Sequence, residues 1–152
     1  MEYQFTTTGK IKYDPRRPKG MKRGTDWWCV VDIDKEITRY YRWWAKTRYG
    51  IILDIPSFDA HISIIRGEKP PKDKMHLWKK YDGKVVEIKY SHYLRQSGDT
   101  RPGPNDFWFV DVDVPFFTHM RDDFGFKSNW NQHITIGRLW YDIGLKCKNG
   151  DV

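Results

Sequence analysis

The feature that most constrains this chain is a succession of elements that occurs twice along it. Residues 30–34 read Val-Val-Asp-Ile-Asp, and residues 109–113 read Phe-Val-Asp-Val-Asp. A helical pattern follows each, and then residues 61–66 and 133–138 read His-Ile-Ser-Ile-Ile-Arg and His-Ile-Thr-Ile-Gly-Arg. Each half therefore predicts a strand, a helix and a second strand that carries a histidine, a hydroxyl residue and an arginine. Two matched halves, related by a pseudo-two-fold axis, are the simplest explanation for this order.

The other patterns predict an α+β chain of short strands and few helices. Asp34 is placed to cap a helix over residues 35–49, and Gly50 to end it. One side of this helix is expected to carry Ile37, Tyr40, Tyr41 and Trp44. Strands are expected at residues 27–34, 60–65, 84–90, 107–114 and 134–139, short helices at 72–80 and 115–123, and a loop at 96–106.

The length of the chain and its basic leader indicate the domain organisation. A chain of 152 residues fits one domain with one continuous core. We expect residues 1–25 to form a basic N-terminal arm or loop, because Pro, Gly and cations dominate its second half. Such an arm could close over an anionic ligand or simply be a solvated leader. Residues 26–152 are then expected to form a single domain built from the two halves.

The two histidine motifs have a geometry that suits acid–base chemistry. Residues i and i+2 of a strand face the same side, so His61 shares a face with Ser63, and His133 shares one with Thr135. Two such strands facing each other would offer two imidazoles and two hydroxyls to one cleft. One neutral histidine can act as general base while the other, protonated, acts as general acid, and the hydroxyls can hold phosphate oxygens. The alternative is a pair of core histidines with satisfied hydrogen bonds.

The remaining polar residues of these segments rank lower. Arg66 and Arg138 are candidate substrate-binding cations, but their odd spacing from the histidines predicts the opposite face unless a bulge or the strand end redirects them. The acidic pairs at 32–34 and 111–113 are interpreted as helix caps, with a metal site as the less favoured reading. His76, His92 and His119 lack the motif and are expected at the surface or in packing.

Charge and aromatic content indicate the class of partner. The net charge is +7, which favours an anionic partner such as a nucleotide or RNA. The chain has 8 Trp, 9 Tyr and 8 Phe, more than a small core needs, and exposed rings beside cations suit nucleobases. The candidate stacking residues are Tyr13, Trp130, Trp140 and Tyr141, with core packing as the alternative for each.

The cysteines and apolar runs bear on compartment. Cys29 and Cys147 are the only cysteines, and they fit neither a CxxC motif nor a Cys/His zinc site. We therefore expect no metal, and a reducing cytoplasm as the compartment. The first ten residues are polar and no apolar run approaches 18 residues, so neither a signal peptide nor a membrane span is expected.

The doubled motif resembles a known family. Two His-x-[Ser/Thr]-apolar motifs, one in each half of a small α+β chain, are similar to those of the 2H phosphoesterase superfamily. The resemblance covers roughly residues 27–139 and implies a bilobal fold, with two pseudo-symmetric lobes of antiparallel sheet, helices outside and a central groove. It implies metal-independent catalysis with His61 and His133 as the acid/base pair and Ser63 and Thr135 as phosphate-binding hydroxyls. The first motif has Ser where the family usually has Thr, a chemically conservative departure.

The resemblance leaves the substrate open. It implies a nucleotide phosphodiester: an RNA 2′,3′-cyclic phosphate, a 2′-5′ oligonucleotide, or a cyclic oligonucleotide immune signal of the kind that phage enzymes degrade. The nucleophile would be water or a neighbouring ribose hydroxyl. The compartment would be the host cytoplasm if the chain is phage-encoded, and neither a cofactor nor an obligate protein partner is implied. The alternative is a non-catalytic nucleotide- or RNA-binding module of the same fold that sequesters its ligand.

Overall fold

The computed structural model describes residues 3–17, 19, 25–99, 101–128 and 130–141. The described chain is an α+β fold, as expected, with one antiparallel sheet and few helices. The seven strands are β1 (Phe5–Tyr13), β2 (Trp28–Asp32), β3 (His61–Arg66), β4 (Val85–Tyr90), β5 (Arg95–Gln96), β6 (Gly103–Asp113) and β7 (His133–Tyr141). The helices are α1 (Lys35–Tyr49), the 3₁₀ helix η1 (Lys72–Leu77) and α2 (Pro115–Asp122).

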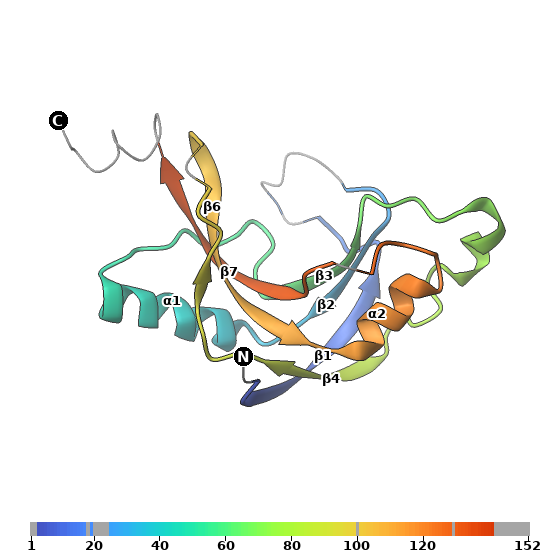
Figure 1. Ribbon diagram of the computed structural model, residues 1–152, viewed down its shortest axis with the longest axis horizontal. Helices are drawn as coiled ribbons and strands as arrows, with labels where there is room; N and C mark the ends of the chain where they lie inside the picture. The colour runs from blue at the N-terminus through green and yellow to red at the C-terminus, as the bar shows by residue number, and fades with distance from the viewer. Residues whose placement is uncertain (1–2, 18, 20–24, 100, 129, 142–152) are drawn as a thin grey trace.

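The order of the strands brings the two motif strands together. Hydrogen bonds run β3-β2-β1-β4-β6, and β6 then pairs with both β5 and β7. Although β3 and β7 are far apart along this path, they contact each other, and Figure 1 shows them near the centre of the molecule. The helices α1 and α2 lie toward opposite ends of the long axis (Figure 1). The two histidine motifs therefore lie on strands that contact each other without pairing.

The expected division into two lobes is not evident in the arrangement of the strands. All seven strands belong to one sheet. The strands β4 and β6 pair only through Lys89 with Asp113 and Tyr90 with Val112. The architecture is accordingly described as one continuous antiparallel sheet.

The expected N-terminal arm contains a strand instead. β1 lies in the middle of the sheet, antiparallel to both β2 and β4. Its alternation explains this: Gly9, Ile11 and Tyr13 are buried, while the intervening Lys10 and Lys12 are exposed. The lysines made the segment look like a solvated leader, but they occupy the outer face of a two-residue period. Residues 18 and 20–24 of the expected arm lie outside the described part, as does 142–152 with Cys147.

The helix α1 begins and ends where the sequence predicts. The side chain of Asp34 accepts a hydrogen bond of 2.9 Å from the main-chain N–H of Glu36, and Gly50 ends the helix with φ of 68°. The buried face carries Tyr41, as expected, together with Thr38 and Ala45, whereas the expected Tyr40 is 53% exposed. The small Thr38 and Ala45 allow the helix to pack closely on the sheet.

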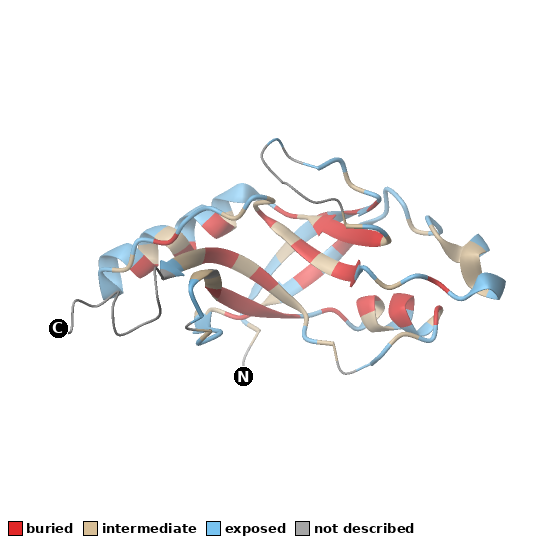
Figure 2. Cartoon of the chain, turned by 90° about the horizontal axis from the view of Figure 1, so that it is seen from above, coloured by how far each residue is buried: buried red, intermediate tan, exposed pale blue. Residues whose placement is uncertain are grey.

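The core lies between the sheet and its helices. Figure 2 shows buried residues along the strands and on the helix sides that face them. Ile62, Ile64, Ile134 and Ile136 of the motif strands are fully buried, so the histidines point to the other side, as predicted. Within the described residues, no helix is long and apolar enough to span a membrane.

Candidate active site

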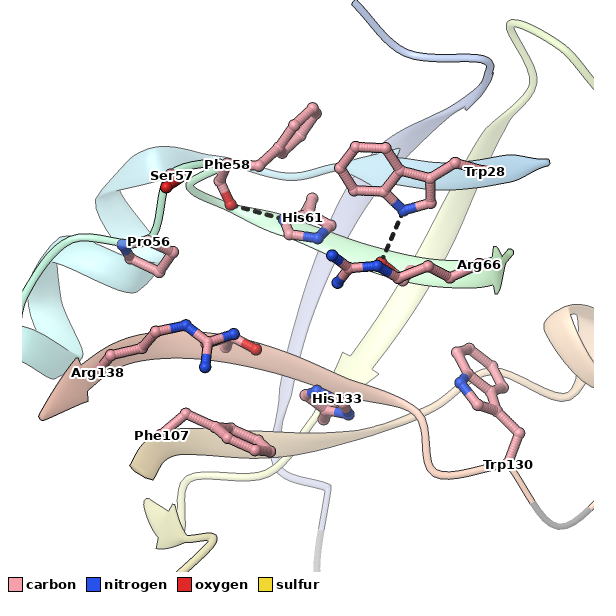
Figure 3. Close-up of a pocket in the computed structure, with 12 residues that line it drawn as sticks. Trp28, Pro56, Ser57, Phe58, His61, Arg66, Phe107, Trp130, His133 and Arg138 are labelled. Carbon is pink, nitrogen blue, oxygen red and sulfur yellow. Dashed lines mark hydrogen bonds between the residues drawn. The ribbon is translucent and has the colours of Figure 1, made fainter. Parts of the chain in front are cut away.

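A pocket of about 430 Å³ lies between β3 and β7, a volume within the range of small-molecule sites. His61, Ser63, His133 and Thr135 all line it, so the structure brings together the four residues predicted to be catalytic. Figure 3 shows the two imidazoles facing the same space from opposite strands. The complete lining is Trp28, Pro56, Ser57, Phe58, His61, Ser63, Arg66, Phe107, Trp130, His133, Thr135 and Arg138.

Both imidazoles are held by a main-chain carbonyl. Nδ1 of His61 lies 2.8 Å from the carbonyl oxygen of Phe58, and Nδ1 of His133 lies 3.1 Å from that of Asn131. Since a carbonyl oxygen only accepts, each Nδ1 must carry a proton to make this bond. We therefore assign the Nδ1–H tautomer to both rings, which leaves each Nε2 as an acceptor when the ring is neutral.

Burial keeps the two rings neutral near pH 7. Desolvation is the main cause that lowers the pKa of His61 to about 4, and the nearby Arg66 lowers it further. The pKa of His133 is also lowered, again mainly by burial and with a smaller contribution from Arg138. Two neutral imidazoles beside two guanidinium groups form a site that is ready to accept a proton and to receive an anion.

A bulge in each motif strand turns its arginine into the pocket. On β3, Ser63 pairs with Val30 and Ile65 pairs with the adjacent Cys29, which leaves Ile64 as the extra residue. A bulge of this kind shifts the alternation by one, so Arg66 faces the same side as His61 and Ser63. A bulge was the exception to regular alternation that would bring Arg66 to the site, and β3 contains one.

The strand β7 contains a bulge at the corresponding position. Thr135 pairs with Phe109 and Gly137 pairs with the adjacent Trp108, so Ile136 is the extra residue. Arg138 consequently lines the pocket, where Figure 3 shows its guanidinium and that of Arg66 turned toward the space between the histidines. Burial and the neighbouring Arg66 lower the pKa of Arg138, but a guanidinium remains charged at neutral pH.

The hydroxyl of Ser63 is oriented by an indole. Nε1–H of Trp28 donates a hydrogen bond of 3.0 Å to Oγ of Ser63. Because the indole can only donate, Oγ accepts this bond and its own proton remains available to an acceptor in the pocket. This arrangement suits a phosphate oxygen, which accepts hydrogen bonds.

Aromatic rings make up much of the remaining lining, and most of them were not predicted. Trp130 lines the pocket as expected, but Trp28, Phe58 and Phe107 do so without having been candidates. The guanidinium of Arg66 lies 5.3 Å from the Trp28 ring centre, and that of Arg138 lies 5.5 Å from the Phe107 ring centre. The sequence contains a signal for one of these three rings. Phe58 precedes His61 by three residues, just as Trp130 precedes His133.

Three of the predicted stacking residues are not among the pocket lining. Tyr13 is 6% exposed and packs edge-on against Trp78, because its position on the inner face of β1 directs it into the core. Trp140 is 51% exposed on β7 but lies beyond the pocket. Tyr141 is the last residue of β7, and its side chain lies outside the described residues.

Three of the four residues in the acidic pairs have structural partners, but only Asp34 is a helix cap as predicted, since the N-cap of α2 is Val114. Asp34 caps α1, Asp32 forms an ion pair with Lys12, and Asp111 forms one of 2.7 Å with Arg95. Among the described residues, no group of three or more His, Cys, Asp or Glu side chains is arranged to hold a metal ion. Of the other histidines, His76 and His119 are exposed and His92 is half-buried, and none of the three lines the pocket.

Comparison with known proteins identifies no relative of this chain. No family model matches the sequence, and neither the curated proteins nor the solved structures contain a match to it. Conclusions about function therefore depend on the pocket and on the residues that resemble the 2H motif.

Two glycines provide a prediction about how the site is built. A Cβ on Gly137 would lie 2.6 Å from Cβ of Leu53 and 2.9 Å from the carbonyl oxygen of Asp54, in a segment that pairs with Arg138. A Cβ on Gly9, in β1, would lie 2.7 Å from the carbonyl oxygen of Asp32. We expect Gly137→Ala and Gly9→Ala each to lower the free energy of unfolding by about 1–3 kcal/mol, measured in urea.

Only one of the two substitutions should disturb the pocket. Gly137→Ala pushes against the segment that holds the main chain of Arg138, through hydrogen bonds of 2.8 and 3.0 Å with Asp54. A Cβ on Gly9 would meet Val31, Asp32 and Ile88, none of which lines the pocket, so Gly9→Ala is the matched control. We expect Gly137→Ala to weaken the binding of inorganic phosphate and Gly9→Ala to leave it unchanged. Equal effects would show that phosphate binding only follows overall stability.

The lowered pKa of His61 predicts how stability depends on pH. The unfolded chain protonates this imidazole near pH 6.5, whereas the folded protein does so only near pH 4. Between these values the unfolded state binds more protons than the folded state. The contribution of neutral His61 to the free energy of unfolding is therefore complete above pH 6.5 and is lost as pH falls toward 4. We expect the wild type to lose about 1–3 kcal/mol more than His61→Gln between pH 7 and pH 4.5 in urea unfolding. Parallel losses would mean that His61 is not buried as a neutral ring.

Proposed function

We propose that this protein is a metal-independent phosphodiesterase that acts on nucleotides, with His61 and His133 as its general acid and base. One observation carries the proposal: two imidazoles share a pocket, and each is accompanied by a hydroxyl and a guanidinium from its own strand. Cleavage of a phosphodiester at neutral pH requires a general acid, a general base and fixed cations. Ser63 and Thr135 hold the non-bridging oxygens in this proposal, and Arg66 and Arg138 offset their charge.

The proton transfers follow from the two tautomers. Nε2 of one histidine takes the proton from water or a ribose hydroxyl, and the resulting oxygen forms a new bond to phosphorus. The bond from phosphorus to the leaving ribose oxygen breaks, and the other histidine, protonated at Nε2, gives its proton to that oxygen. With water the product is a phosphomonoester, whereas with a neighbouring ribose hydroxyl it is a cyclic phosphate. The carbonyl oxygens of Phe58 and Asn131 hold the rings in position throughout.

The acid form must be created when the substrate binds. Both imidazoles have a lowered pKa, so the neutral form of each ring is favoured. An anionic phosphodiester between them stabilises an imidazolium and raises its pKa. Substrate binding is therefore coupled to the uptake of a proton, which supplies the general acid.

This coupling gives a prediction for binding. We expect a nonhydrolysable dinucleotide phosphorothioate to bind more tightly as the pH falls from 8 to 5.5, by up to tenfold per pH unit for one proton taken up. Isothermal titration calorimetry in buffers of different ionisation enthalpy measures the number of protons directly. Uptake of about one proton is the expected result, and binding without any would contradict the proposed origin of the acid.

We further propose a 2H-like organisation in which two halves of the sheet are related by a pseudo-two-fold axis. The matched bulges at Ile64 and Ile136, and the same order of His, hydroxyl and Arg on β3 and β7, support it. In this view the pocket is the central groove between two lobes that share one sheet. The proposed setting is the cytoplasm, or the host cytoplasm for a phage protein.

The substrate class is tested by a panel assayed in EDTA. The panel contains RNA ending in a 2′,3′-cyclic phosphate, 2′-5′ oligoadenylates, cyclic di- and trinucleotides, and a 3′-5′ linear RNA. We expect cleavage of at least one of the first three kinds in EDTA, with products separated by chromatography. Loss of all cleavage in EDTA would contradict metal independence. Tight binding without turnover would instead favour a module that sequesters its ligand.

A further inference from the structure

Two arginines outside the pocket contact the two bulges from opposite helices. Nη1 of Arg42, on α1, donates a hydrogen bond of 2.9 Å to the carbonyl oxygen of Ile136, the extra residue of β7. Nη1 of Arg121, on α2, donates one of 2.9 Å to the carbonyl oxygen of Ile64, the extra residue of β3. The helix α1 follows β2, which pairs with β3, but its arginine contacts β7. The helix α2 follows β6, which pairs with β7, but its arginine contacts β3. The contacts are therefore crossed.

The bulges need such a partner. The extra residue of a bulge is left out of the strand pairing, and a buried carbonyl oxygen without a donor is costly. Ile64 and Ile136 are both fully buried, so water is not available to their main chains in the way it is at an exposed bulge. A guanidinium from a neighbouring helix supplies the missing donor, and a charged donor makes a strong hydrogen bond.

Each arginine is itself fixed by a bidentate carboxylate. Arg42 binds Asp59 through bonds of 3.1 Å from Nη1 and Nη2, and Asp59 lies two residues before His61. Arg121 binds Glu68 through bonds of 2.7 and 2.9 Å, and Glu68 lies two residues after Arg66. The side chain of Arg121 is 4% exposed and that of Arg42 is 14% exposed, so both guanidinium groups are largely shielded from solvent, whereas the carboxylate of Glu68 is 33% exposed.

The contacts extend from the bulges to the loops that carry site residues. Arg121 also donates from Nε to the carbonyl oxygen of Lys127, and its guanidinium lies 5.2 Å from the ring centre of Trp130, which lines the pocket. Asp59 follows Phe58, whose carbonyl oxygen holds His61. Each arginine thus joins the bulge of one motif strand to a loop that leads into the other.

We infer that Arg42 and Arg121 are positioning residues that hold the bulges in place, with Arg42 directing Arg138 and Arg121 directing Arg66 toward an anionic phosphate. The inference rests on the proposed function for the ligand, but the geometry of the bulges does not depend on turnover. A purely structural role for the two arginines would not produce crossed specificity. The experiment therefore tests whether Arg42 affects only Arg138 and whether Arg121 affects only Arg66.

The first arm of the test uses the free protein. Nε–Hε signals of Arg66 and Arg138 are assigned by NMR and followed in Arg42→Lys and Arg121→Lys, which keep a charge beside the carboxylate but lose the planar fork. We expect Arg42→Lys to shift the signal of Arg138 and leave that of Arg66, and Arg121→Lys to do the reverse. Arg39→Lys, on the exposed side of α1, is the control and should shift neither. Shifts of both signals in both variants, or of neither, would overturn the inference.

The second arm measures the affinity for inorganic phosphate by NMR titration. We expect Arg42→Lys, Arg121→Lys, Arg66→Lys and Arg138→Lys each to weaken binding by about 3- to 10-fold, the scale of one impaired charge-assisted hydrogen bond. Arg42→Lys combined with Arg138→Lys should weaken it no more than Arg138→Lys alone, while Arg42→Lys combined with Arg66→Lys should give the product of the single effects. Multiplied effects in both combinations would overturn the inference.

The two proposals fail in distinguishable ways. If Arg66→Lys and Arg138→Lys leave phosphate binding unchanged, the proposed phosphate site fails, and the first arm alone decides the positioning role. If either helix variant does not fold, Asp59→Asn or Glu68→Gln replaces it, because these keep the guanidinium but remove its bidentate partner. The same crossed shifts are expected from them, and their absence counts against the inference.

Discussion

Replacing either motif histidine by alanine should lower kcat/KM for the cleaved member of the substrate panel by about 10²–10⁴-fold, the usual contribution of a positioned acid or base. His61→Ala removes one Nε2 from the pocket and His133→Ala removes the other. The double variant should be little less active than either single variant, because the base and the acid act together in the same reaction step. Initial rates measured by product chromatography, at saturating and subsaturating substrate, give both kinetic constants.

A second histidine pair provides the control for this prediction. His76 and His119 are exposed and do not line the pocket, so His76→Ala and His119→Ala should keep wild-type kinetics. The folded state of each variant is checked by urea unfolding at pH 7. Turnover that persists in both motif variants would show that the histidines are core residues and that the chemistry lies elsewhere.

Replacing a pocket arginine by glutamine should cost about 10²–10³-fold in kcat, the scale found when one preorganised donor to a developing negative charge is removed. Arg66→Gln and Arg138→Gln each remove a guanidinium that faces the space between the imidazoles. Since a transition state carries more charge on its phosphate oxygens than the ground state, kcat should fall more than the affinity for substrate. Steady-state kinetics with the panel substrate measure both.

Arg66→Gln also has an expected effect on stability that is opposite in sign to its effect on catalysis. Arg66 contributes to lowering the pKa of Arg138, because the two cations repel each other. Removing Arg66 should therefore leave the free energy of unfolding unchanged or raise it slightly. Arg39→Gln, which breaks only an exposed pair with Glu36, is the control for both measurements. A large loss of stability in Arg66→Gln with unchanged kcat would make this arginine structural.

The sequence is a good guide to the motif strands because their physical signals are local. The alternation of isoleucines with His61, Ser63, His133 and Thr135 predicts which side chains are buried and which share a face. Asp34 and Gly50 likewise predict the ends of α1, since a cap and a stop each depend on a few neighbouring residues. These expectations are confirmed in the structure.

The place of the arginines could not be predicted because it depends on pairing between strands. A bulge is defined by which residue of the partner strand is skipped, and nothing within residues 61–66 marks Ile64 as the extra one. Regular alternation places Arg66 and Arg138 on the opposite face, and only the stated exception, a bulge, brings them into the pocket. The hydrogen bond from Arg42 to Ile136 spans 94 positions of the chain, and that from Arg121 to Ile64 spans 57, so neither has a local signal.

The strand β1 shows a different reason for a wrong expectation. Its alternation is visible in Gly9, Ile11 and Tyr13, but the lysines and the later run of Pro and Gly favour a loop by composition. A ring in a basic loop is in turn a candidate for stacking, which is why Tyr13 is predicted at the site. Its ring lies in the core, while Phe58 and Phe107, with no cation next to them in the sequence, line the pocket.

The dependence of kcat/KM on pH, measured in EDTA with the cleaved panel member, tests the central claim most directly. Two histidines acting as acid and base predict a bell-shaped profile for the wild type, with one limb from each group. The residual activity of His61→Ala and that of His133→Ala should each lose one limb, and not the same one. A bell that survives unchanged in both variants, or activity that requires a metal ion, would contradict the account.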